Sequence, residues 1–508
     1  MNSGTLSITG LGGIVIGPGG QLTTLSLSSG QTLNVTHTTT VVTGGALTVT
    51  NGDFSSSILK IDGGTVDAPN LRNVPDLQVD AGVLTLSGNS SSVRVSGNNP
   101  GTINVTGDLS LGDGSKFDGY DHQGALSVGP HQVTLQSARF ANLGTIATLN
   151  GGILNAANGV TLGIGDNLVG SGTVSAPIVA GFGSTISASG SLMLGDMTAV
   201  NGFGTAGLIS VGSHTVTLQD SNDAVLDSLA LVSLGDNAGS PGTLNAANGL
   251  TLDFGGNITG FGTVDTPNTS VKPLINNGHI TGNSVAERVT LTGYVKGVGT
   301  CDFCVITGTD APGFSTAVVN RGTVSYNGTL EIEIGGTTPG SGYDQLKHIL
   351  GSGVADLGGT LDVLLIDGFV PSAENTFNIL TAAGGIQGTF ATESLPSLTG
   401  DLFWDVIYET NQVLLEVVTP YAADFDGNGM VDGTDLGVLL GNWGQDVTMK
   451  EGELNDTVPV NGLDLGLLLG DWTGTLPLNV TSVPAPSSVL LLAVGAAGLV
   501  PWRRRECR

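Results

Sequence analysis

The stretch GALSVGPHQVTLQ, residues 124–136, occurs a second time as GLISVGSHTVTLQ at residues 207–219. A further segment, GILNAANGVTL from residue 152, returns as GTLNAANGLTL from residue 242. The copies are 83 residues apart in the first pair and 90 in the second, so a loop of about seven residues is inserted between them. Each copy spans several short runs of alternating apolar and polar residues closed by turn residues. This pattern indicates a solenoid in which successive coils stack.

The same pattern of short alternating runs between turn residues extends over residues 1–328. Runs such as GALTVTNG from residue 45 and GVLTLSGN from residue 82 lie between Gly and Asn turns, and both residue types adopt left-handed backbone conformations at little cost. We expect a mainly β chain, a right-handed parallel β-helix or related β-solenoid, with roughly 20–25 residues per coil and about 13–16 coils. An array of β-sandwiches is the alternative. In texture the region resembles the passenger regions of autotransporter-like adhesins.

Residues 329–420 contain longer and more apolar strand-like runs, such as GTLEIEIGG from residue 328 and LFWDVIYE from residue 402. Their order is similar to that of the segment that closes many bacterial passenger-type proteins. We predict a β-rich cap that covers the last coil and protects its edge from aggregation.

Composition excludes several classes of protein. With 82 glycines and only 11% charged residues among 508, the chain suits short strands and tight turns better than helices. A hydrophobic content of 39% argues against disorder. The net charge of −28 predicts repulsion from nucleic acid and from anionic lipid everywhere except at the extreme C-terminus.

Residues 424–435, DFDGNGMVDGTD, have the spacing of a calcium loop. Oxygen side chains stand at loop positions 1, 3, 5, 9 and 12, Gly429 stands at the turn position 6, and a backbone carbonyl is available at position 7. The predicted Ca²⁺ ligands are Asp424, Asp426, Asn428, Met430, Asp432 and Asp435. An acidic, solvated turn is the alternative.

A loop–helix unit occurs twice, because Asp435 leads into LGVLLGNWG and Asp464 leads into LGLLLGDWTG. This duplication, with Asp at position 12, resembles the dockerin type I family over residues 421–474. The second loop has Val458 in place of the turn glycine and fewer carboxylates, so we expect a weak or empty site. Its predicted ligands are Glu453, Asn455, Asn461 and Asp464. The resemblance implies a calcium-stabilised docking module whose partner is a cohesin-like protein.

The C-terminal residues 483–508 resemble the PEP-CTERM sorting tail of bacterial exported proteins, which implies a sorting protease as partner. The tail combines a short motif, an apolar run from residue 489 to 500 and an arginine cluster. The motif and cluster residues are Val483, Pro484, Ala485, Pro486, Arg503, Arg504 and Arg505. The apolar run is short for a spanning helix, and the arginines would hold the C-terminus on the cytoplasmic side. A plain tail anchor is the alternative. Residues 475–482 are expected to form a linker.

No export signal is visible at Met1, although the tail implies export. We therefore expect a truncated or misplaced start, and a protein of the cell envelope or extracellular surface that contacts the membrane only through its tail.

No catalytic residue is predicted. The basic residues before residue 420 are scattered, Glu331 and Glu333 suit the solvent face of a strand, and His131 and His214 suit turn packing. The Cys-x-x-Cys pair at residues 301 and 304 lacks further ligands for zinc. In an exported protein, we expect this pair to form a local disulfide or to remain as two free buried thiols.

The expected function is therefore non-catalytic: a solenoid that presents an adhesive surface, for example toward a surface polysaccharide, and a Ca²⁺ module that docks a protein. A carbohydrate-active β-helix enzyme, hydrolase or lyase, carried by a dockerin is the alternative from another class. A purely structural matrix component is a third. Converging acidic or basic side chains in a groove would favour the enzyme, and smooth Ser, Thr and Asn rows would favour adhesion or structure.

Overall fold

The computed structural model describes residues 4–9, 13–18, 22–50, 53–68, 74, 76–86, 90–91, 94–97, 101–399, 402–419, 421–426, 430–447, 452, 454 and 459–473. The chain divides into two units: the first is Met1–Thr399 with Trp404–Val417, and the second is Gly400–Phe403 with Val418–Arg508.

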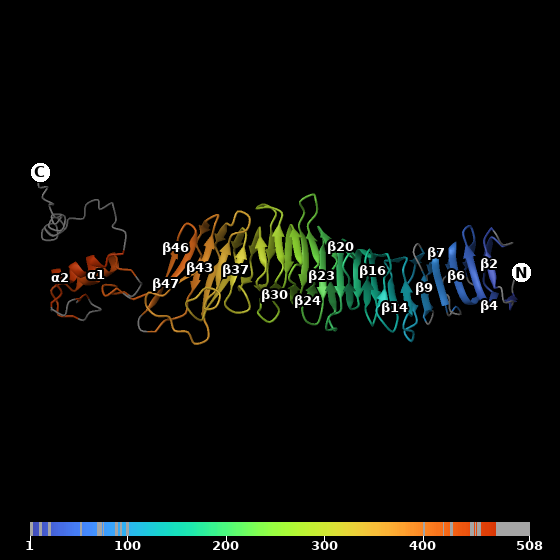
Figure 1. The fold of residues 1–508 in the computed structure, drawn as a ribbon, viewed down its shortest axis with the longest axis horizontal. Helices are drawn as coiled ribbons and strands as arrows, with labels where there is room; N and C mark the ends of the chain where they lie inside the picture. Colours follow the sequence, from blue (N-terminus) through green and yellow to red (C-terminus); the bar gives the residue numbers. More distant parts are fainter. Residues whose placement is uncertain are drawn as a thin grey trace. The chain divides into compact units, whose positions relative to one another are not determined.

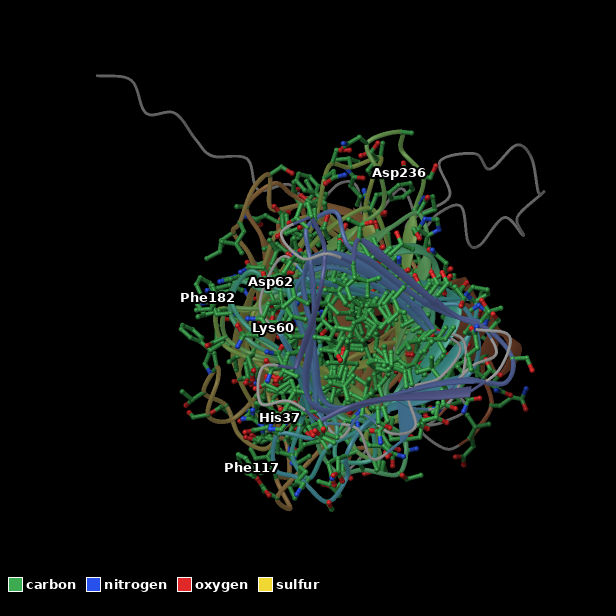
Figure 2. The ribbon with its side chains drawn as sticks, turned by 90° about the vertical axis from the view of Figure 1, so that its right-hand side faces the viewer. His37, Lys60, Asp62, Phe117, Phe182 and Asp236 are labelled. Carbon is green, nitrogen blue, oxygen red and sulfur yellow. A yellow bond between two sulfur atoms is a disulfide. The ribbon has the colours of Figure 1, made fainter. Side chains whose placement is uncertain are left out.

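The first unit is a parallel β-solenoid of about 14 turns, as the repeats predict, and not an array of sandwiches. Its coils follow one another along the chain, from β2 (Ile14–Ile16) past β30 (Leu274–Asn276) (Figure 1). Three rows of parallel strand pairing run along the described part of the unit, and the longest strands bend from one row into the next. Viewed along the coils, apolar side chains fill the interior, whereas Phe117, Phe182 and Asp236 lie outside (Figure 2).

The first row contains β2 (Ile14–Ile16), β4 (Gln31–Val42), β6 (Asp53–Ala68), β7 (Asp76–Leu86), β9 (Arg94–Gly97), β12 (Tyr120–His122), β15 (Ala141–Asn142), β17 (Val160–Leu162), β19 (Ile178–Ala180), β21 (Phe203–Thr205), β24 (Ala224–Leu226), β27 (Leu250–Leu252), β30 (Leu274–Asn276), β33 (Tyr294–Lys296), β36 (Thr309–Asp310), β39 (Thr329–Ile334), β42 (Thr360–Leu365) and β45 (Thr392–Ser394). The second row contains parts of β6 and β7 with β3 (Thr24–Leu27), β5 (Ala46–Val49), β10 (Thr102–Val105), β13 (Ala125–Gly129), β16 (Ile146–Asn155), β18 (Asn167–Ser175), β20 (Thr185–Gly195), β22 (Leu208–Gly212), β25 (Leu231–Leu234), β28 (Asn257–Gly260), β31 (His279–Gly282) and β34 (Thr300–Asp302). The third row contains parts of β4, β6, β16, β18 and β20 with β1 (Gly4–Ile8), β8 (Ser90–Ser91), β11 (Leu109–Gly112), β14 (Gln132–Gln136), β23 (Thr215–Gln219), β26 (Gly242–Ala246), β29 (Gly262–Asp265), β32 (Val289–Leu291), β35 (Cys304–Ile306), β38 (Val324–Tyr326), β41 (Ala355–Leu357) and β44 (Ile386–Gly388).

The period-two alternation forms the core, because inward residues of successive coils pair in register. In the second row, Leu126 pairs with Ala147, then Leu168, Ile186 and Ile209, and each is at most 1% exposed. Burial of each larger aliphatic side chain contributes about 1.5–3 kcal/mol. The stability of the solenoid is therefore spread along its length, with each coil contacting its neighbours.

Glycine is required where one coil passes close to the next. Gly170 has a φ of +131°, and a Cβ at this position would lie 1.7 Å from the carbonyl oxygen of Leu149 in the preceding coil. Any other residue would clash with that backbone, which explains one of the many glycines in the sequence.

The two copies of the sequence repeat lie four coils apart, since Ser127 is joined to Ser210 through Thr148, Val169 and Ser187 in the pairing register. The inserted residues are divided between two turns. The continuous strand β16 of the first copy is replaced by β25 and β26, which are separated by residues 235–241, and the turn before β25 is also longer.

Parallel pairing continues past residue 328 through β39, β42 and β45. A second sheet in this region has the order β37-β40-β43-β47-β46, formed by β37 (Val318–Arg321), β40 (Gln345–His348), β43 (Thr376–Ala382), β47 (Gln412–Val418) and β46 (Phe403–Tyr408). Pairing of β43 with β47 is antiparallel. Phe377 of β43 packs against Tyr343 and against Trp404 of β46.

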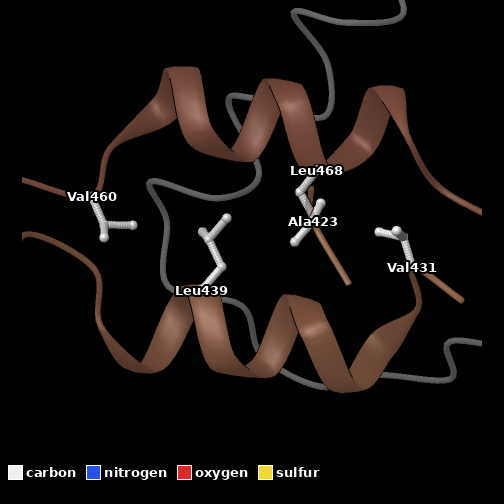
Figure 3. Packing of buried hydrophobic residues seen from close by; sticks show 5 residues of the cluster. All are labelled: Ala423, Val431, Leu439, Val460 and Leu468. Carbon is white, nitrogen blue, oxygen red and sulfur yellow. The ribbon is translucent and has the colours of Figure 1, made fainter. Parts of the chain in front are cut away.

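The second unit contains α1 (Gly433–Gly441) and α2 (Gly462–Gly470). The two helices enclose a small core of Ala423, Val431, Leu439, Val460 and Leu468 (Figure 3). Each is at most 1% exposed. Among the described residues, neither helix has the length and apolar character needed to cross a membrane.

Candidate metal centre

The start of α1 is fixed by a reciprocal pair of side chains. Asp432, the N-cap, accepts a hydrogen bond from the N–H of Thr434 at 2.7 Å, and the carboxylate of Asp435 accepts one from the N–H of Asp432 at 2.9 Å. These two carboxylates satisfy backbone donors that a helix start otherwise leaves without partners.

Asp435 also holds the loop that precedes the helix. Its Oδ1 accepts hydrogen bonds from the N–H groups of Phe425, at 2.8 Å, and Asp426, at 3.3 Å. The side chain is fully buried. Each carboxylate oxygen has two lone pairs, so the Oδ2 atom, which accepts from Asp432, retains a lone pair for a cation.

The carboxylates of Asp424, Asp426 and Asp435 come together, with one oxygen of each within 4.8 Å of the others. Asp424 is half-buried, Asp426 is exposed and Asp435 is buried, so the cluster is open on one side. Three converging carboxylates suit a hard divalent cation, and the open side allows further oxygen ligands or water to approach.

The other predicted ligands of the first loop have different positions. Asp432 caps the helix with one carboxylate oxygen and is not part of the three-residue cluster. Met430 is half-exposed. Asn428 lies outside the described residues.

The second loop–helix unit repeats the hydrogen-bonding frame of the first. Asp464 Oδ1 accepts from the N–H of Leu454 at 2.8 Å and its Oδ2 from that of Asn461 at 2.8 Å, and Asn461 accepts from Leu463 at 2.8 Å. These bonds match those of Asp435 and Asp432 in the first unit. The N-cap residue has changed from a carboxylate to an amide, while Glu453 and Asn455 lie outside the described residues.

The sorting residues, Val483 to Pro486 and Arg503 to Arg505, also lie outside the described residues. Of the two readings of the cysteine pair, the structure has the disulfide between Cys301 and Cys304. Both cysteines are buried in the solenoid.

One pocket on the solenoid was not anticipated from the sequence. Its polar lining includes Tyr294, Lys296, Glu331, Glu333 and Asp344. Glu331 and Glu333 do alternate with buried residues on β39, as the strand pattern predicts. The pocket itself has no sequence signal, because its residues come from separate coils and one loop.

Burial raises the pKa of two carboxyl groups that line this pocket. It raises the pKa of Asp344 to about 7, an effect that backbone hydrogen bonds to this carboxylate oppose. Burial also raises the pKa of Glu333, with a further contribution from the neighbouring charge of Glu331. The Tyr294 hydroxyl donates a hydrogen bond to Glu331.

No protein-family model matches the chain, and no curated protein sequence matches it significantly.

Proposed function

We propose that this chain is an exported, non-catalytic protein of the cell surface or extracellular matrix. Its solenoid presents a binding surface, and its duplicated loop–helix unit binds Ca²⁺ and docks a protein partner of the cohesin type. The observation that carries the proposal is the convergence of Asp424, Asp426 and Asp435 within 4.8 Å on a doubled helix-capping frame.

The chemistry of the cluster supports calcium. All of its donors are oxygens, as hard cations prefer, and the affinity of such loops rises with the number of carboxylates. The second loop keeps the frame around Asp464 but has lost the acidic N-cap. One tight site and one weak or empty site are therefore expected. Binding of the ion would contribute to the folding free energy of this small unit.

The surface of the solenoid supports a binding role without catalysis. One outward row across successive coils contains Ser127, Thr148, Ser187, Ser210 and Ser233, with Val169 between Thr148 and Ser187. Their hydroxyls have no hydrogen-bond partner among the residues that the structure describes, so they are available to an external polar partner. The C-terminal tail, by its resemblance to sorting segments, would place this surface outside the cell.

An extracellular carbohydrate-active enzyme is the second candidate, and the pocket of Glu331 and Glu333 is the observation that favours it. Glycoside hydrolysis uses two carboxylates. The test is release of reducing ends or unsaturated sugars from a polysaccharide panel, with Glu331→Gln as the inactive control. Turnover that this variant abolishes would replace the non-catalytic proposal.

The calcium proposal is tested by calorimetric titration of the full chain with CaCl₂. The wild type is expected to show one tight site, Asp426→Ala to lose it, and Asp446→Asn, which changes an exposed carboxylate outside the cluster, to retain it. Capture of a protein partner from a cell-surface extract should then require Ca²⁺ and fail with Asp426→Ala. An unchanged titration of Asp426→Ala would contradict the assignment.

A further inference from the structure

The pocket on the solenoid flank has walls that are fixed by hydrogen bonds at two points. The loop of residues 311–317 lines the pocket together with residues of β33 and β39. Gly297 and Gly313 exchange two backbone hydrogen bonds of 2.9 and 3.0 Å. At the other end of the loop, Asp344 Oδ1 accepts from the N–H of Ala317 at 2.7 Å. The loop is therefore held in place between two anchored positions.

Asp344 ties this loop to the floor of the pocket. Its Oδ2 accepts from the N–H of Glu333 on β39 at 2.8 Å, and the residue is only 1% exposed. One buried carboxylate thus joins the rim at Ala317 to the strand that carries Glu331 and Glu333. A site whose parts are positioned before the ligand arrives loses less entropy on binding.

An aromatic ring stands at the rim between the two anchors. Phe314 lines the pocket, yet 59% of its surface is exposed. An anchored loop that keeps a large apolar ring in water beside a polar floor provides a flat surface for a partner with an apolar face.

The floor supplies both donors and acceptors. Glu331 and Glu333 accept hydrogen bonds, the ammonium of Lys296 donates them, and Lys296 has no ion-pair partner within 4.0 Å in the described part of the chain. Tyr294 donates to Glu331 and so fixes the orientation of that carboxylate. The set suits a partner rich in hydroxyl groups, each of which both donates and accepts.

The charge and the size of the pocket limit the chemical class of the ligand that it can bind. An anionic sugar would be repelled by Glu331 and Glu333, and Lys296 offsets part of the negative charge that would attract a cationic amino sugar. The hollow itself has room for little more than one water molecule, so a partner lies across its mouth, where Phe314 and the polar floor contact a single ring and not a longer segment.

We propose that this pocket binds one neutral pyranose unit of a polysaccharide. The C–H face of the sugar ring lies on Phe314, and its hydroxyls hydrogen-bond to Glu331, Glu333 and Lys296. This inference rests on the proposed binding role of the solenoid and adds to it the location of one contact and the chemical class of the partner.

The test is binding of the full chain to defined oligosaccharides, measured by saturation-transfer NMR and calorimetry. The probes are neutral gluco-, manno-, galacto-, xylo- and N-acetylglucosamine oligomers, with oligouronates and glucosamine oligomers as charged counterparts. At least one neutral oligomer is expected to bind. Phe314→Ala and Glu331→Gln should weaken it at least tenfold. Phe254→Ala, which removes an 81% exposed ring from a turn away from the pocket, should leave it unchanged.

Three results would overturn the inference: no neutral oligomer binds, a charged oligomer binds better, or Phe314→Ala and Glu331→Gln bind like the wild type. The proposed function of the whole protein is tested separately. The measurements are attachment of the full chain to insoluble polysaccharides and Ca²⁺-dependent capture of a protein. If Phe314→Ala still attaches as the wild type does, the solenoid binds elsewhere and only the pocket assignment fails. If the wild type neither attaches nor captures a partner, the proposed function fails as well.

Discussion

Arg321 and Asp310 form an ion pair inside the solenoid, with 2.8 Å between Nη2 of the guanidinium and Oδ1 of the carboxylate. Their side chains are 2% and 0% exposed. Arg321 also donates to the carbonyl oxygen of Gly299 at 2.7 Å. This pair lies where β36 of the solenoid meets β37 of the five-stranded sheet, so a polar joint connects the two sheets.

Removing one partner of this pair should be costly. Arg321→Met leaves the carboxylate of Asp310 buried without its counter-charge, and we expect a loss of about 3–5 kcal/mol in unfolding free energy. The double variant Arg321→Met/Asp310→Leu should recover most of the loss, because no buried charge remains. The measurement is urea unfolding followed by circular dichroism. Lys60→Met, which removes a partly exposed ion pair with Asp80, is the control and should cost at most about 1 kcal/mol. A double variant as unstable as the single one would contradict the explanation.

His348 predicts a pH dependence of stability. It is fully buried, its Nδ1 donates to the carbonyl oxygen of Gly322 at 2.7 Å, and its Nε2 accepts from the hydroxyl of Tyr326 at 3.1 Å. Burial lowers the pKa of His348 to about 4 from 6.5. Between these two pH values the unfolded chain binds a proton that the folded chain does not. Stability should therefore fall as pH decreases from 6.5 to about 4, by at most roughly 1.4 kcal/mol per pH unit, and His348 should contribute no slope above 6.5.

The contribution of His348 to the pH dependence is isolated by measuring the unfolding free energy of the wild type and of His348→Asn across pH 4–8. The difference in unfolding free energy between the two should shrink toward acid pH. Other titrating groups cancel in this comparison, including Asp344, whose raised pKa gives a slope of the opposite sign. A difference for His348→Asn that does not vary with pH would show that the side chain titrates normally.

The disulfide between Cys301 and Cys304 closes a very short loop. We expect the double variant Cys301→Ala/Cys304→Ala to lose roughly 2 kcal/mol, as chain entropy predicts for a loop of this size. Mass spectrometry after alkylation should find both cysteines protected until the chain is reduced and unfolded, because both are buried. Labelling of Cys301 and Cys304 without reductant would rule out the bond.

Much of the solenoid could be predicted because its stabilising features are local and repeated. Alternation places Leu126 and Ala147 inside and Ser127 and Thr148 outside, and this pattern recurs in each coil. Pairing beyond residue 328 could not be predicted so well. The strands there are longer and more apolar, which suggests a change of fold, yet β39 and β42 still pair in parallel with their neighbours.

The candidate metal centre was predictable in part. The spacing of the loop predicts that Asp424, Asp426 and Asp435 lie close together, because one turn and one helix start determine their positions, and the structure has them in one cluster. The helix-capping role of Asp432 competes with its predicted role as a ligand, and spacing alone does not separate the two. The pocket on the solenoid could not be predicted at all, because Tyr294, Glu331 and Asp344 come together only once the coils have stacked.

The two loop–helix units allow the structural and ion-binding roles of one carboxylate to be separated. Asp435 and Asp464 each accept backbone hydrogen bonds in the same frame, so either one changed to Ala should destabilise the second unit by a similar amount in EGTA. Loss of such caps costs about 0.5–2 kcal/mol. At a Ca²⁺ concentration 100 times the dissociation constant, the wild type and Asp464→Ala should each gain about 2.7 kcal/mol, while Asp435→Ala should gain none. Tryptophan fluorescence follows the unfolding of this unit, since Trp472 packs against its core. An equal gain in unfolding free energy in both variants would show that the ion does not bind at Asp435. No gain in the wild type would show that Ca²⁺ does not stabilise this unit.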